Sequence, residues 1–136
     1  MSERTSRGGC QCGAVRYIAR GEPKVIACCH CPSCRKSLAA PVSAWVMFDS
    51  PAFQFEKGEP KRYASSQGVE RSFCGECGTA LTYTSEMFAG VIDVTVGSLD
   101  APESMAPQMH IWTSTQLPWL RIADGLPTHT EFPPFP

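Results

Sequence analysis

The cysteines are the residues of this chain best suited to chemistry, because they are so closely spaced. Seven of the eight cysteines fall into three short motifs: Cys10-x-Cys12, Cys29-x-Cys31-x-x-Cys34 and Cys74-x-x-Cys77. Thiolates separated by one or two residues can converge on one metal ion, and zinc is the usual occupant where thiols stay reduced. Disulfides are the alternative, but these spacings suit metal chelation better than bridges between distant strands.

The number of cysteines in each motif predicts two different kinds of metal site. Cys10 and Cys12 together with Cys74 and Cys77 would complete a closed four-sulfur site. A glycine follows the second cysteine of each pair, where a tight turn needs little steric bulk. A shared zinc ion would fasten the N-terminal strand to the middle of the domain. The alternative is that one pair binds metal and the other consists of buried thiols.

The triplet of Cys29, Cys31 and Cys34 supplies only three ligands. The fourth would be water, a substrate or a distant residue, and an open position of this kind is what distinguishes a catalytic zinc from a structural one. Cys28 adjoins the triplet but points the opposite way in an extended segment, so we interpret it as a small buried apolar residue. His30 is out of phase in the same way, which favours a supporting or surface position.

Two residues outside the cysteine motifs are candidates for catalysis. Arg35 could offset the negative charge of a tris-thiolate zinc or attract an anionic substrate, whereas we interpret Lys36 as a solvated charge. His110 is a candidate base, and on a strand it would share a face with Trp112. The alternative for His110 is a hydrogen-bonded structural histidine. His129, near the Pro-rich end of the chain, is expected to be solvated and inert.

Short β-strands are predicted to position these residues. Apolar and polar residues alternate in several stretches, such as 92–96, and turns rich in glycine and proline separate the stretches. This pattern predicts a mainly β, antiparallel fold. A short helix is expected at Pro32–Ser37, with Pro32 in its first turn, and a second helical turn near Pro102–Met105.

Length and composition place limits on the organisation and the partners of the chain. Its 136 residues predict a single domain spanning 1–136, with an extended or disordered Pro-rich tail at 128–136. A net charge of −1 argues against a nucleic-acid-binding protein. No apolar run approaches the roughly 20 residues of a membrane helix, and the N-terminus lacks a signal-like apolar stretch. We therefore expect a cytoplasmic protein without a membrane partner, and the sequence predicts no oligomeric state.

The motifs together resemble those of the glutathione-dependent formaldehyde-activating enzyme family, which includes centromere protein V-like proteins. The resemblance runs from about Gly8 to Pro127. It is carried by five stretches, namely Gly9–Tyr17 (GCQCGAVRY), Cys29–Arg35 (CHCPSCR), Arg71–Gly78 (RSFCGECG), Pro107–Trp112 (PQMHIW) and Leu117–Trp119 (LPW).

This resemblance implies a β-rich, tent-like zinc fold shared with a small Rab-binding protein family. It implies that one set of cysteines binds a structural zinc ion, namely Cys10, Cys12, Cys74 and Cys77. It also implies that Cys29, Cys31 and Cys34 bind a catalytic zinc ion. The activity it implies is that of a carbon–sulfur lyase. Such an enzyme forms S-hydroxymethylglutathione from glutathione and formaldehyde, or breaks it down, or acts in the same way on the adduct of another small thiol.

Three classes of function fit the sequence. The first is a zinc-dependent carbon–sulfur lyase, in which a substrate thiol is held as its thiolate and His110 removes the hemithioacetal proton. The second is a non-catalytic, zinc-stabilised protein-binding module. The third is a thiol-based redox or metal-handling protein, for which Cys28 beside Cys29 is the only special support. An exchangeable fourth ligand at the triplet would favour the first class over the second.

Overall fold

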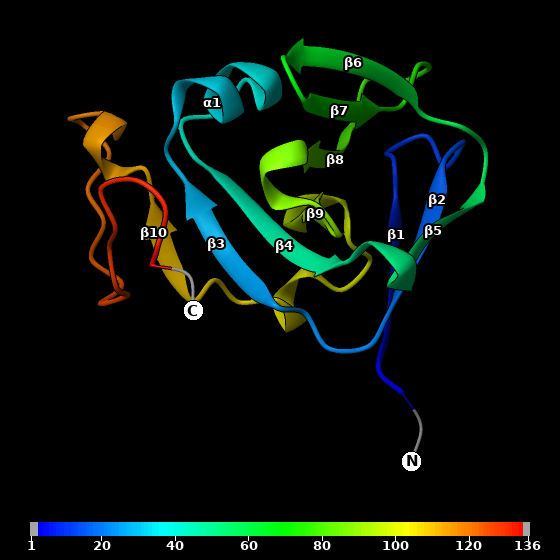
Figure 1. The fold of residues 1–136 in the computed structure, drawn as a ribbon, viewed down its shortest axis with the longest axis horizontal. Coiled ribbons are helices and arrows are strands. Elements are labelled where there is room, and N and C mark those ends of the chain that lie inside the picture. The colour runs from blue at the N-terminus through cyan, green and yellow to red at the C-terminus, as the bar shows by residue number, and fades with distance from the viewer. Residues whose placement is uncertain (1–2, 135–136) are drawn as a thin grey trace.

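The computed structural model describes residues 3–134, and these form two β-sheets (Figure 1). The smaller sheet has the strand order β1-β2-β5, and the larger sheet has the order β10-β3-β4-β9-β8-β7-β6. The strands are β1 (Thr5–Gly9), β2 (Arg16–Arg20), β3 (Val25–Cys29), β4 (Ser43–Asp49), β5 (Phe53–Lys57), β6 (Lys61–Ser66), β7 (Val69–Phe73), β8 (Ala80–Ser85), β9 (Val91–Thr95) and β10 (Met109–Ile111). The predicted mainly β, antiparallel fold is confirmed, with one parallel pair between β10 and β3.

The helices in the described part of the chain are short. The α-helix is α1 (Pro32–Leu38), and the 3₁₀ helices are η1 (Ser50–Ala52), η2 (Glu86–Phe88), η3 (Val96–Ser98), η4 (Pro102–Ser104) and η5 (Thr113–Thr115). Both predicted helical segments are therefore present, as α1 and η4. Cys31 caps the N-terminus of α1, because its sulfur accepts a hydrogen bond from the backbone N–H of Cys34. Among these elements, no helix has the length and apolar character needed to cross a bilayer.

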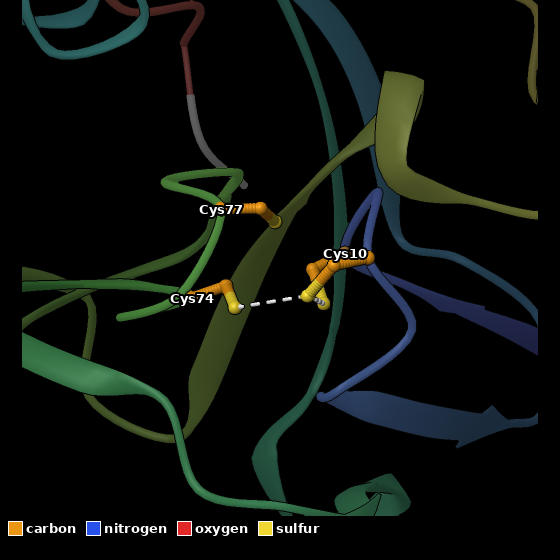
Figure 2. Close-up of side chains that lie close together, drawn as sticks. Cys10, Cys74 and Cys77 are labelled. Atoms are coloured by element: carbon orange, nitrogen blue, oxygen red, sulfur yellow. Dashed lines mark hydrogen bonds between the residues drawn. The ribbon is translucent and has the colours of Figure 1, made fainter.

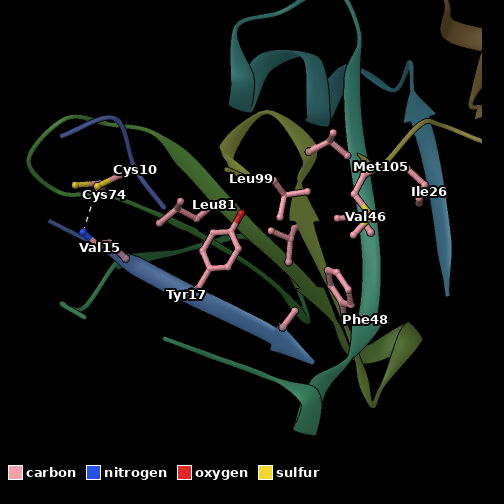
Figure 3. Close-up of a cluster of buried hydrophobic side chains, with 13 residues drawn as sticks. Cys10, Val15, Tyr17, Ile26, Val46, Phe48, Cys74, Leu81, Leu99 and Met105 are labelled. Atoms are coloured by element: carbon pink, nitrogen blue, oxygen red, sulfur yellow. Dashed lines mark hydrogen bonds between the residues drawn. The ribbon is translucent and has the colours of Figure 1, made fainter. Parts of the chain in front are cut away.

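One face of the larger sheet packs against the smaller sheet and forms the main core (Figure 3). Tyr17 of β2 is fully buried there with Phe48 of β4 and Leu81 of β8. The Tyr17 hydroxyl hydrogen-bonds Ser98 at 2.7 Å, which satisfies its polar end. A side chain at Gly8 would collide with this hydroxyl, so the close approach of β1 requires glycine.

The C-terminal segment runs beside β10 and is held there by backbone hydrogen bonds (Figure 1). The N–H of His110 donates to Pro127 O, the N–H of His129 donates to His110 O, and both distances are 2.9 Å. Residues of the predicted tail up to 134 lie along the edge of the larger sheet, and its last two residues, 135–136, lie outside the described residues. His129 is half-buried, which corrects the expectation that it is solvated.

Candidate metal centres and active site

The two cysteine pairs converge across the space between two loops (Figure 2). All four sulfurs, those of Cys10, Cys12, Cys74 and Cys77, lie within 4.8 Å of one another. Cys10 and Cys12 Sγ are 3.6 Å apart, and Cys12 and Cys74 Sγ are 3.8 Å apart. Sulfurs around a tetrahedral zinc with bonds of about 2.3 Å would be about 3.8 Å apart. The donor set and its spacing therefore fit one four-coordinate zinc ion.

The two loops of this four-cysteine cluster use the same backbone design. Gly13 N–H donates to Cys10 O at 3.1 Å, and Gly78 N–H donates to Cys74 O at 2.8 Å. Both glycines have positive φ angles, 80° and 83°, which other residues adopt only with strain. The Val15 N–H also donates to Cys10 Sγ at 3.2 Å. These loops explain why each pair is followed by glycine.

The triplet forms a second convergence of sulfurs at the end of β3 and the start of α1. The Sγ atoms of Cys29, Cys31 and Cys34 lie within 4.8 Å of one another. Hydrogen bonds from the Cys29 and Cys34 thiols lower the pKa of Cys31, although burial opposes the shift. The thiolate form is the one that binds metal, so the donor set also fits zinc.

Arg71, rather than Arg35, is the cation placed against the triplet. The Nη2 of Arg71 lies 3.8 Å from Cys34 Sγ, and its Nη1 donates to Ser37 Oγ at 3.0 Å. The guanidinium also lies over the Tyr83 ring, 4.9 Å from its centroid, and Arg71 is only 8 % exposed. Arg35 is half-buried on α1, and it does not line the cavity that adjoins the triplet, which is described below. Its predicted catalytic role thus gains no support from its position.

A cavity of about 440 Å³ adjoins the triplet on the face of the larger sheet opposite the main core. Its floor contains one register row across β3, β4, β9, β8 and β7. That row consists of Val25, Met47, Asp93, Tyr83 and Arg71. Residues far apart in the sequence therefore line one cavity because neighbouring strands place them on the same face, and among them Arg71 reaches the sulfur of Cys34.

Asp93 is the one acidic residue among those that line this cavity. Burial raises the pKa of its carboxyl group to about 7. A carboxylate that titrates near neutral pH inside a cavity is suited to accept or return a proton. The sequence analysis missed Asp93 as a functional residue, because its alternation with Ile92 and Val94 reads as the solvent-facing side of a strand.

His110 lies on the other face of the larger sheet from the cavity. Its Nδ1 is 2.9 Å from His30 Nε2, and its Nε2 is 2.7 Å from Asp124 Oδ2. Both histidines are buried, at 1 % exposure for His30 and 3 % for His110, and neither lines the cavity. The expected supporting position of His30 agrees with this arrangement. The role of His110 as a base stays a prediction, and its hydrogen bonds favour a structural role.

Cys28 and Trp112 also take positions that strand alternation alone does not describe fully. Cys28 is half-buried, lies outside the triplet and is the register partner of His110. The prediction that Trp112 shares a face with His110 is wrong. Strand β10 ends at Ile111, and the left-handed φ of 59° at Trp112 turns its side chain to the cavity wall.

Comparisons with known proteins show the family and the fold of this chain. The sequence model of the glutathione-dependent formaldehyde-activating enzyme family matches residues 5–115. The chain belongs to this family. An uncharacterized lyase of Schizosaccharomyces pombe is 37 % identical over 76 residues, which are 56 % of this chain and 55 % of the relative. The chain therefore matches about half the length of that relative.

The fold of this formaldehyde-activating-enzyme family member is also similar to that of a Rhodobacter sphaeroides protein of known crystal structure. The TM-score is 0.57, with 19 % sequence identity. The likeness covers 69 % of this chain and 87 % of the other. At this identity the comparison supports the fold and carries no argument about activity.

Proposed function

We propose that this family member is a zinc-dependent carbon–sulfur lyase that acts on the adduct of a small aldehyde with glutathione or another thiol. S-hydroxymethylglutathione is the simplest such adduct. The observation that carries the proposal is that three convergent sulfurs adjoin a cavity. Membership of the family and the lyase name of the yeast relative support it.

The residues fit two zinc ions with different tasks. We propose that the four-cysteine cluster holds a structural ion and that Cys29, Cys31 and Cys34 hold the catalytic one. When bound there, zinc supplies positive charge that lowers the pKa of a substrate thiol and orients its sulfur. Arg71 offsets the excess negative charge of three thiolates, which is the task that the sequence analysis assigned to Arg35.

The lyase reaction needs a group that accepts one proton. When a hemithioacetal breaks down, the carbon–sulfur bond breaks and its electron pair leaves with sulfur as thiolate. The carbinol O–H loses its proton as the carbon–oxygen double bond forms. We propose that Asp93 accepts this proton, because it lines the cavity, whereas His110 positions β10 against β3 through its contacts with His30 and Asp124.

Zinc content and turnover, measured together, test the proposal. Protein purified without chelator is expected to contain about two zinc ions per chain. Cys31→Ser should lose about one of them and lower S-hydroxymethylglutathione turnover at least ~100-fold, because a ligand of the catalytic ion is missing. Cys28→Ser is the matched control, since Cys28 adjoins the triplet without belonging to it.

Two results would contradict the proposal in different ways. If Cys31→Ser keeps both the second zinc ion and full activity, the triplet is not the active centre. If the native protein binds about two zinc ions and turns over no thiol–aldehyde adduct, the protein-binding module becomes the better explanation.

A further inference from the structure

We propose that the cavity selects adducts of apolar aldehydes larger than formaldehyde, and that Phe132 is a determinant of this selection. The inference rests on the proposed lyase function and names the class of its aldehyde. In the reaction, the adduct R–CH(OH)–S–R′ gives the aldehyde R–CHO, the thiolate R′–S⁻ and a proton. The group R is the one that we place in the cavity.

The size of the cavity is the first argument. Its volume is about 440 Å³, within the range of sites that enclose small organic ligands. The hydroxymethyl group derived from formaldehyde has only two non-hydrogen atoms and occupies roughly the space of two waters, about 60 Å³. Most of the cavity would remain unfilled by formaldehyde, whereas an alkyl or aryl group would use it.

The chemistry of the cavity wall is the second argument. Val25, Ala27, Met47, Met109 and Ile111 present apolar side chains, and among the described residues of the lining only Arg71 and Asp93 are charged. Arg71 already contacts Cys34 and Ser37. A wall of this kind binds apolar groups favourably and provides few partners for the two carboxylates of glutathione.

A neighbouring hollow suits the polar thiol better. It shares Pro32, Ser33, Ser65 and Arg71 with the cavity, so the two spaces adjoin. Its lining adds Lys36 and the hydroxyl of Ser37. These groups can bind carboxylate and amide groups. With the thiol part of the adduct in this hollow, the apolar cavity is left for the part that derives from the aldehyde.

Three aromatic rings form one wall of the cavity, and Phe132 among them comes from the C-terminal segment. The Phe132 ring lies 5.0 Å from that of Phe88 and 5.3 Å from that of Trp112, in edge-to-face arrangements. A hydrogen bond of 3.0 Å from Trp112 N–H to Glu131 O holds the segment in place. All three rings line the cavity, and Phe132 lies beyond the family match, which ends at residue 115. Phe88 and Trp112 lie within that match, so Phe132 is the ring of this wall that comes from outside it.

Binding of S-alkylglutathiones to the zinc-loaded protein tests the inference without turnover. The alkyl group occupies the place of R, so calorimetry with the S-methyl, S-butyl and S-hexyl compounds measures how the cavity treats apolar groups. We expect affinity to rise about threefold per methylene. Phe132→Ala should weaken S-hexyl binding about tenfold and leave S-methyl binding unchanged. Trp119→Ala is the control, because Trp119 is 66 % exposed and lies outside the cavity lining.

A variant that fills the cavity gives an independent check. Met47→Trp should weaken S-hexyl binding by about tenfold, again without changing S-methyl binding. Equal affinity for the S-methyl and S-hexyl compounds would overturn the inference, even if S-hydroxymethylglutathione is turned over. Rising affinity without turnover of either the formaldehyde or the hexanal adduct would instead overturn the lyase proposal and leave the apolar selection standing.

Discussion

The two cysteine clusters contain the same ligand chemistry in different surroundings. In the four-cysteine cluster, loops from distant parts of the chain supply four sulfurs, and Cys12 and Cys77 are exposed to solvent. In the triplet, one continuous segment supplies three sulfurs beside a buried arginine and a cavity. The comparison teaches that similar donor sets can have different neighbours, and the proposal that the triplet is the reactive centre rests on those neighbours.

The largest expected effect would come from opening the closed cluster. Cys74→Ser removes a buried ligand that joins the β7–β8 turn to the N-terminal loop, so the binding energy of the ion no longer contributes to folding. We expect the free energy of unfolding to fall by more than about 4 kcal/mol, measured by urea denaturation. Cys28→Ser should cost less than about 1 kcal/mol. Equal losses would mean that the cluster does not hold the two loops together.

Arg71→Met tests whether the charge beside the triplet matters to its metal. Loss of the guanidinium leaves the negative charge of the thiolates uncompensated, so zinc affinity at the triplet should fall by about 10- to 100-fold. Competition with a chromophoric chelator would measure this, with Arg35→Met as the control. The four-cysteine cluster should keep its ion in both variants. A larger loss with Arg35→Met would restore the assignment made from sequence.

Asp93→Asn sharpens the comparison through pH. Burial raises the folded-state pKa of Asp93 to about 7, above the ordinary 3.8, so the folded protein binds more protons than the unfolded chain between these values. The stability of the native protein therefore falls as pH rises from about 4 to about 7, because the unfolded chain releases the Asp93 proton at lower pH than the folded protein does. The variant should gain about 2 kcal/mol of stability relative to native between pH 5 and pH 8. If the difference in stability between the variant and the native protein does not change with pH, the carboxyl group of Asp93 is solvated.

Asp124→Asn should have the smallest effect. Asp124 is 45 % exposed, and its hydrogen bond to His110 lies on the opposite face from the triplet. We expect a loss of about 1 kcal/mol in the free energy of unfolding and less than a tenfold change in turnover. Glu22→Gln, at an exposed ion pair with Arg4, is the control. A 100-fold loss of turnover would support direct catalysis by His110 together with Asp124.

The sequence predicted those features that depend on residues close together in the chain. The spacing of the cysteines predicted both clusters, because one or two intervening residues fix how far apart two sulfurs can lie. Glycine after each pair predicted a tight turn with little room for a side chain, and Pro32 predicted the start of α1. Alternation predicted that Cys28 and His30 would lie off the triplet.

Other features depended on contacts that local pattern does not contain. Trp112 does not continue the alternating pattern of β10, because its own backbone adopts a left-handed conformation. Arg71 replaced Arg35 as the cation beside the triplet because the strand order places β7 on the same side as α1. The Pro-rich segment became ordered because β10 is an edge strand with backbone groups available for pairing.

The sequence by itself thus determined the cysteine clusters, the β class and the family resemblance, because these follow from composition, spacing and short-range alternation. Only the tertiary structure decided that Arg71 lies against the triplet, that Asp93 and Phe132 line the adjoining cavity, and that His110 lies on the other face of the sheet. The physical reason is strand register. It brings residues from β3, β4, β9, β8 and β7 into one row, and the burial that raises the pKa of Asp93 arises only once the sheet has formed.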